Sequence, residues 1–171
     1  GFSASQANAK IDPANVVGMW LFEEDGGDIA KDSSGAGNDG KIVGPKKWVD
    51  GKFGKALQFN GTDVYVEVES KDSLVLKELT IVAWANLKSS QGTRWQSIMM
   101  KGQNPRNYLL VIDKDTQKLQ LSITKGAPDA WGGPIGGPVI TDKKWHHLAG
   151  VIGEKAGLVI YADGLEAGKQ G

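Results

Sequence analysis

Apolar residues recur along the chain in short runs that are separated by polar, glycine-rich stretches. Strict alternation in VYVEVE places Val64, Val66 and Val68 on one face of a strand. The segment KLQLSI alternates in the same way and turns its polar residues to the opposite face. Other runs rich in β-branched or aromatic residues predict further strands, namely VVGMWLF, ALQFNG, LTIVAWANL, SIMMKG, YLLVID, WHHLAGVI and GLVIYADG.

Helical spacing is sustained nowhere over three turns, and VESKDSLVLKEL predicts at most a short helical turn. Glycine, at 24 of 171 residues, is about twice as frequent as usual and indicates many tight turns. DKDTQKL predicts a hairpin link, while residues 125–138 (KGAPDAWGGPIGGP) predict a loop because three prolines oppose a regular ladder. The fold class expected is all-β, an antiparallel β-sandwich.

Length and charge narrow the function classes. The 171 residues suit one domain, and 20 basic against 20 acidic side chains give little support for binding nucleic acid. No apolar run is long enough to span a membrane, and the absence of cysteine excludes disulfides and thiolate metal sites. Residues 1–14 read as a leader, in which Ala7-Asn8-Ala9 matches the small-residue pattern before a secretory cleavage point. We therefore expect a secreted or cell-surface protein.

Three segments carry a family resemblance: GKFGKALQFNGTDVYVEV, LTIVAWANL and KKWHHLAGVIGEKAGLVIYADG, in that order. They resemble the laminin-G-like jelly rolls of the concanavalin A-like lectin/glucanase superfamily, as does the opening VVGMWLFEEDGGDIAKDSSGAGNDG. The resemblance implies a jelly-roll domain over residues 15–171. It also implies further strands after YADGLEAGKQG, so we expect open sheet edges that pair with another copy or with a missing C-terminal segment.

The acidic stretch at residues 21–40 raises the question of a metal. Related domains often hold calcium near the loop after the first strand, and the matching positions are Asp32, Asn38 and the carbonyl region of Gly35. Asp63 matches a second calcium-bearing loop of pentraxin-like relatives. An ordinary turn rich in Asp, Asn and Gly is the alternative at both places.

Catalytic chemistry has weaker support. Retaining glucanases of the superfamily place two carboxylates four residues apart on one strand, with an acid between them. Glu67 and Glu69 share a face, but the residue four after Glu67 is Lys71, so this pattern is broken. The adjacent His146 and His147 face opposite sides of a strand and are expected to be structural rather than zinc ligands.

Tryptophans in loops are the best candidates for contact with a sugar, because an aromatic platform matches the apolar face of a sugar ring. Trp131 and Trp95 lie in turn-rich segments, with Trp48 as a third option, whereas Trp20, Trp84 and Trp145 fall inside strand patterns and are expected in the core. The expected ligand-binding residues are Trp131, Trp95, Arg94, Asn107 and Tyr108.

Together these features predict a secreted, non-catalytic carbohydrate-binding module, with calcium stabilising a rim loop. The alternative is a structural or adhesive module that contacts protein, and the third, less favoured function is glycoside hydrolysis.

Overall fold

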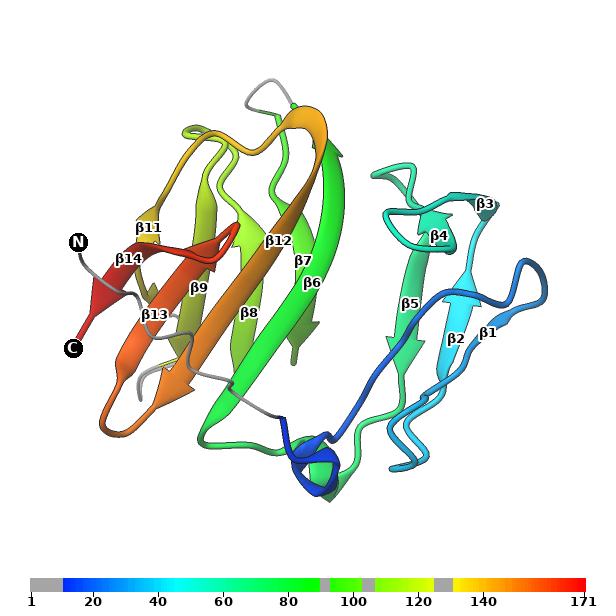
Figure 1. The fold of residues 1–171 in the computed structure, drawn as a ribbon, viewed down its shortest axis with the longest axis horizontal. Coiled ribbons are helices and arrows are strands. Elements are labelled where there is room, and N and C mark those ends of the chain that lie inside the picture. The colour runs from blue at the N-terminus through cyan, green and yellow to red at the C-terminus, as the bar shows by residue number, and fades with distance from the viewer. Residues whose placement is uncertain (1–10, 90–92, 103–106, 125–130) are drawn as a thin grey trace, which may run out of the picture. The chain divides into compact units, whose positions relative to one another are not determined.

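The structure, a computed structural model, describes residues 11–89, 93–102, 107–124 and 131–171 (Figure 1). Every paired strand in this part of the chain is antiparallel, and the helical content is two short 3-10 turns, η1 (Pro13–Asn15) and η2 (Asp72–Leu74). The all-β class expected from the sequence is confirmed. No helix within the described ranges is long and apolar enough to cross a membrane.

The chain divides into two compact units, Gly1–Val75 and Leu76–Gly171. The first unit holds a three-stranded sheet of order β1-β2-β5 and the ribbon β3-β4. Its small core is formed by Ala30, Ile42 and Leu57. The bounds of its strands are β1 (Ile29–Ala30), β2 (Gly40–Val43), β3 (Lys47–Asp50), β4 (Lys55–Gln58) and β5 (Tyr65–Val68).

The second unit is a two-layered sandwich. One sheet has the order β14-β13-β12-β6 and the other β10-β9-β8-β7, with β11 also paired to β9 (Figure 1). Fully buried leucines and isoleucines of both sheets pack between them. The strands are β6 (Leu79–Lys88), β7 (Gln96–Lys101), β8 (Tyr108–Ile112), β9 (Leu119–Thr124), β10 (Trp131–Gly132), β11 (Ile135–Gly136), β12 (Asp142–Gly153), β13 (Gly157–Ala162) and β14 (Leu165–Gln170).

Both predicted alternations are present. On β5 the side chains of Tyr65 and Glu67 are exposed while Val66 is partly buried, and on β9 Leu119 and Leu121 enter the core. The predicted hairpin link also forms. There the Asp113 carboxylate accepts hydrogen bonds from the amides of residues 115 and 116, which closes the turn between β8 and β9.

Three expectations need correction. VVGMWLF forms no ladder beyond an isolated bridge between Trp20 and Asp32, because the amide of Met19 donates to the Asp32 carboxylate instead of to a strand. The loop expected at 125–138 contains two short strands, β10 and β11. The intervening Pro134 cannot donate to a ladder, but its carbonyl accepts a hydrogen bond from Leu121 N at 3.2 Å.

Trp84 is the third correction, because it lies outside the core. The alternation of β6 sends Ile81 inward and Trp84 outward, where its side chain is 43% exposed. Its ring lies edge-on to that of His147, with the ring centroids 5.3 Å apart. Trp20 and Trp145, by contrast, are partly buried.

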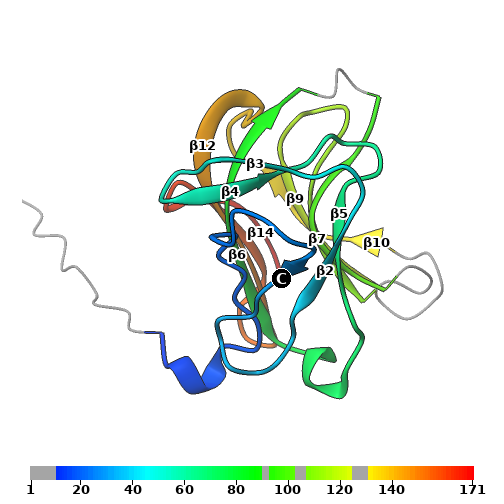
Figure 2. The ribbon, with the colours of Figure 1, turned by 90° about the vertical axis from the view of Figure 1, so that its right-hand side faces the viewer.

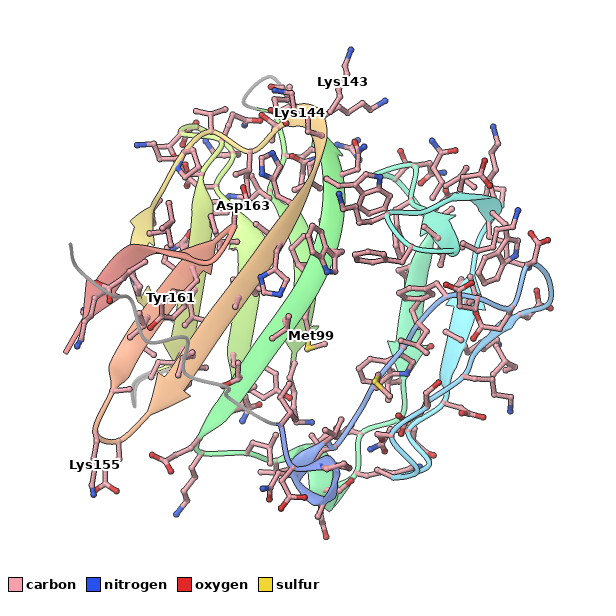
Figure 3. The ribbon with its side chains drawn as sticks, in the orientation of Figure 1. Met99, Lys143, Lys144, Lys155, Tyr161 and Asp163 are labelled. Atoms are coloured by element: carbon pink, nitrogen blue, oxygen red, sulfur yellow. The ribbon has the colours of Figure 1, made fainter. Side chains whose placement is uncertain are left out.

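A histidine held between two carboxylates joins the start of β12 to the turn after β13. His146 contacts Asp163 Oδ2 through Nδ1 at 2.7 Å and Asp142 Oδ1 through Nε2 at 2.9 Å. A register shift between Asp142 and Trp145, with Lys143 at φ 65°, places Asp142 within reach of the imidazole. In Figure 3, Asp163 and the lysines at 143 and 144 lie at the same end of the unit.

This arrangement shifts the pKa values of His146 and of both carboxylates. Burial disfavours the imidazolium, but hydrogen bonds to Asp163 and Asp142 outweigh it and raise the pKa of His146 above its ordinary value of 6.5. The hydrogen bond from His146 lowers the pKa of Asp142 to about 2 and also lowers the pKa of Asp163. The two carboxylates therefore favour the protonated, charged form of the His146 imidazole.

The cluster predicts a specific pH dependence of stability. A raised folded-state pKa means that His146 contributes stability fully below pH 6.5 and loses it as the pH rises through that higher pKa. Plots of Tm against pH between about 5 and 9 should therefore fall less steeply for His146→Gln than for the wild type. The matched variant His147→Gln should keep the wild-type slope, and equal slopes for wild type and His146→Gln would contradict the assignment.

Candidate functional site

The predicted sugar-binding residues lie at two opposite ends of one sheet. The register of β7 on β8 pairs Gln96 with Ile112 and Lys101 with Tyr108. Trp95 therefore lies at one end, just before β7, while Tyr108 lies at the other. At about 3.3 Å per residue, these ends are about 17 Å apart. Arg94 and Trp95, which are both exposed, do not belong to one site with the remaining candidates.

The opposite end brings three strands together. Thr124 N donates to Asn107 O at 3.3 Å, and Thr124 pairs with Trp131 across β9 and β10. Tyr108, beside them, is only 6% exposed and belongs to the core. Tyr108 thus packs the sandwich interior instead of offering a surface platform. Only the backbone of Trp131 belongs to the described structure.

A row of polar side chains follows β9 toward this end. Gln120, Ser122 and Thr124 alternate with the core residues Leu119 and Leu121, so they lie on the face of the sheet that is turned away from that core, where Gln120 and Thr124 are partly buried and Ser122 is buried. We define the β9 face as this row and its neighbours across the strand pairs, namely Met100, Leu109, Val111, Gln120, Ser122, Thr124 and Ile135.

Two oxygens of this row have no hydrogen-bond partner. Gln120 Nε2 donates to Ser122 Oγ at 3.0 Å, but Gln120 Oε1 and Thr124 Oγ1 are buried and unpaired. Buried polar groups without partners are rare in proteins, and each one calls for an explanation such as an ordered water or a ligand. Both oxygens are buried but chemically free to accept hydrogen bonds, and the threonine hydroxyl can also donate one.

Apolar groups flank the polar row. Leu109 pairs with Ser122 and Val111 with Gln120 on the same face, where both Leu109 and Val111 are buried, while Met100 and Ile135 are about half exposed at its sides. This mixture suits a ligand that has both C–H surface and hydroxyl groups. Within the described residues the β9 face carries no Asp or Glu, so it lacks the carboxylate pair that glycoside hydrolysis needs.

The sequence contained the signal for this face. Alternation in KLQLSI already separated Gln120 and Ser122 from the core positions. A polar strand face is normally one that faces solvent. Only the unpaired oxygens, which the sequence does not reveal, distinguish this face as a candidate site.

In the first unit, Asp32 organises the acidic loop. Its Oδ1 accepts from the amides of Met19 and Ser34, and its Oδ2 accepts from the amide of Asn38, each at 2.9 Å. Burial opposes ionisation, but hydrogen bonds from the Ser34 side chain and from these amides outweigh it and lower the pKa of Asp32 to about 2. The structure thus brings the predicted residues Asp32 and Asn38 together.

Asn38 is fully buried and ties the loop to the segment before it. Its Nδ2 donates to Val17 O at 2.7 Å, and Trp20 Nε1 donates to the Asn38 carbonyl at 2.9 Å. Gly35, between Asp32 and Asn38, has φ +86°, a conformation that glycine adopts without strain. The loop is therefore a network of hydrogen bonds around one carboxylate.

These residues offer few ligands for calcium, which takes six to eight oxygens. Both oxygens of Asp32 already accept amide hydrogens, and Asp39 is bound to Lys31. Asn38 Oδ1 is buried and unpaired, but the described residues contain no group of three Asp, Glu, His or Cys suited to a metal. Calcium binding by Asp32, Asn38 and Gly35 stays a prediction.

Asp63 lies in a turn that Asn60 holds. Asn60 Oδ1 accepts from the amides of Thr62, Asp63 and Val64, and Asn60 Nδ2 donates to Asp63 Oδ1 at 2.7 Å. This is the hydrogen bonding of an Asx turn. Trp48, the remaining sugar candidate, packs partly buried against the small core of the first unit.

Comparison with known proteins places the chain in a family. The family model Laminin_G_3, described as concanavalin A-like lectin/glucanases superfamily, matches residues 60–171. Because the match covers more than half of the sequence, the chain belongs to this superfamily. The expected family is confirmed. No curated protein matches the chain.

A solved structure has the same fold. The crystal structure of the binding domain of Paraclostridial Mosquitocidal Protein 1 matches with a TM-score of 0.72 and 16% sequence identity. The match covers 90% of this chain but 39% of that one. At this identity the likeness shows the fold alone.

The Asp32 network makes a prediction about stability. Asp32→Ala removes the acceptor of three amides and should lower the free energy of unfolding by about 2 kcal/mol, because hydrogen bonds to charged groups contribute about 1.5–3 kcal/mol. Urea unfolding monitored by tryptophan fluorescence measures it. The control Asp63→Ala, in an exposed turn, should change stability by less than half as much. Equal losses would show that Asp32 is an ordinary turn residue.

Proposed function

We propose that the chain is a non-catalytic carbohydrate-binding module that contacts its ligand through the β9 face. The observation that carries this proposal is the pair of unpaired oxygens, Gln120 Oε1 and Thr124 Oγ1, in a polar row bordered by apolar side chains. Sugars present hydroxyl groups beside apolar C–H surface, so a matching site pairs hydrogen-bonding groups with apolar contacts.

The geometry suits an extended ligand. Gln120, Ser122 and Thr124 are spaced at every second residue, so the row spans about 13 Å along the strand at about 3.3 Å per residue. Trp131 pairs with Thr124 at the end of the row. In this proposal Trp131 and Asn107 keep their predicted role at the ligand's end, and Trp95 and Arg94 do not take part.

Export to the cell exterior belongs to the same proposal, because a surface glycan is the expected ligand. The small-residue pattern that favours it, Ala7-Asn8-Ala9, lies outside the described residues.

A glycan array probed with the purified chain tests the function, followed by calorimetric titration with the best ligand. Gln120→Ala and Thr124→Ala should each weaken binding about fivefold to tenfold, since one hydrogen bond contributes about 1 kcal/mol. Trp131→Ala should also weaken it. Both polar substitutions are on the outer face, and an unchanged Tm for each variant excludes unfolding as the cause.

Trp95→Ala is the matched control, because it removes an exposed tryptophan at the opposite end of the same sheet. It should leave affinity within about twofold of the wild type. Binding that is lost in Trp95→Ala but kept in Thr124→Ala would move the site to that end. A chain that binds no glycan on the array would refute the proposed function.

A further inference from the structure

A single side chain connects two segments at one end of the second unit. The imidazole of His146, in β12, contacts Asp142 Oδ1 through Nε2 at 2.9 Å and Asp163 Oδ2 through Nδ1 at 2.7 Å. Asp142 begins β12, whereas Asp163 lies in the turn between β13 and β14, and the two segments lie side by side (Figures 1 and 2). The imidazole side chain is 13% exposed, so most of its surface is shielded from water.

The backbone of β12 fixes Asp163 independently of the imidazole. Asp163 Oδ1 accepts a hydrogen bond from His147 N at 2.9 Å, and the amide of Asp163 donates to His147 O at 2.8 Å. Asp163 and Gly164, with φ values of 52° and 81°, also form the two-residue turn between β13 and β14. Neither these bonds nor the turn depends on the ionisation of His146, so Asp163 stays in place when the imidazole loses its proton.

Asp142 is held by fewer contacts outside its own segment. Its carboxylate accepts the amide of Lys144 at 3.0 Å and contacts Lys144 Nζ at 3.4 Å, and both partners move together with it. Its backbone pairs with Lys88 of β6, and the register shifts directly afterwards. Lys143, in this bulge, has φ 65°, a conformation that a residue other than glycine keeps only where its surroundings impose it. The contact with His146 is therefore a support of the bulge.

The number of ring protons decides how many carboxylates His146 can hold. An imidazolium donates from both nitrogens, whereas a neutral imidazole has one N–H and one acceptor nitrogen. In the neutral state, one of the two contacts sets a lone pair of the ring against a carboxylate oxygen, and the two repel each other. Because Asp163 is fixed and its contact is the shorter one, the remaining proton stays on Nδ1, and the contact with Asp142 breaks.

We propose that His146 and Asp142 form a proton-operated latch: loss of the imidazolium proton releases the Asp142 carboxylate and opens residues 142–144, while Asp163 stays bound to Nδ1. This inference does not rest on the proposed function. The pH dependence of global stability does not distinguish the two carboxylates, whereas the latch assigns the release to one of them. Ile140 is fully buried before this segment and Trp145 pairs with β6 after it, so the opening is limited to the bulge.

Charged groups around the latch come from four parts of the second unit. The turn between β8 and β9 is one of them, since Ile140 N donates to Gln117 O at 3.4 Å. The charged and titratable groups of these parts are Asp142, Lys143, Lys144 and His147 of β12, Asp163 of the turn before β14, Lys88 of β6, and Asp113, Lys114, Asp115 and Lys118 between β8 and β9. Burial lowers the pKa of His146, but hydrogen bonds to Asp163 and Asp142 outweigh it and hold the pKa above 6.5, so the latch opens above that pH.

Limited digestion with trypsin tests the opening, because Lys143 and Lys144 lie inside the segment. The exposed Lys155, at the opposite end of the unit, is an internal reference (Figure 3). The ratio of cleavage after Lys143 or Lys144 to cleavage after Lys155 cancels the pH dependence of trypsin itself. The neutral fraction of His146 rises about tenfold between one pH unit below and one above its pKa, so this ratio should rise about fivefold to tenfold. A rise of less than about twofold would overturn the proposal.

Two glutamine variants separate the latch from a general loosening at high pH. His146→Gln has no titrating group at the latch, so its cleavage ratio should no longer depend on pH. His147→Gln is the matched control, because the ring of His147 packs on Trp84 at the other face of the strand, and it should keep the wild-type response. A wild-type response in His146→Gln, or its loss in His147→Gln, would overturn the assignment.

The tautomer of His146 identifies the released carboxylate without any substitution. Long-range 1H–15N spectra of the wild-type chain, labelled with 15N-histidine, distinguish a protonated from an unprotonated ring nitrogen and also give the pKa that the digestion requires. Above that pKa, His146 should carry its proton on Nδ1, which faces Asp163. A proton on Nε2 would show that Asp142 keeps its contact, and it would overturn the proposal.

Discussion

Close packing of aliphatic side chains between two sheets is the constraint on which the second unit depends. Leu110, Leu121, Leu148 and Ile160 are fully buried in this layer, and each contributes about 2–3 kcal/mol by leaving water. The sheets meet so closely that Gly150 has no room for a side chain, since a Cβ there would lie 2.9 Å from Leu121 Cδ1. With the inner positions committed to packing, recognition falls to the outer faces, edges and end loops.

That division explains how much the sequence could predict. Alternation of side chains gave the strands and identified Leu119 and Leu121 as core, because burial itself imposes the period of two. The aromatic character of Trp84 alone did not place it, since an aromatic residue in a strand can lie on either face. Its position follows from that of Ile81, which is buried and, three residues away on the same strand, lies on the opposite face. VVGMWLF reads as a strand, but the Asp32 carboxylate takes the amide that a ladder would use.

The candidate site was less predictable, for a geometric reason. Residues that are close in sequence, such as Trp95 and Tyr108, lie at opposite ends of a sheet once the hairpin register is known. Conversely, Asn107, Thr124 and Trp131 come together from three separate segments of the chain, and the composition of any one segment does not predict this. Unpaired oxygens such as Gln120 Oε1 are likewise visible only after folding, because hydrogen bonding depends on the completed environment.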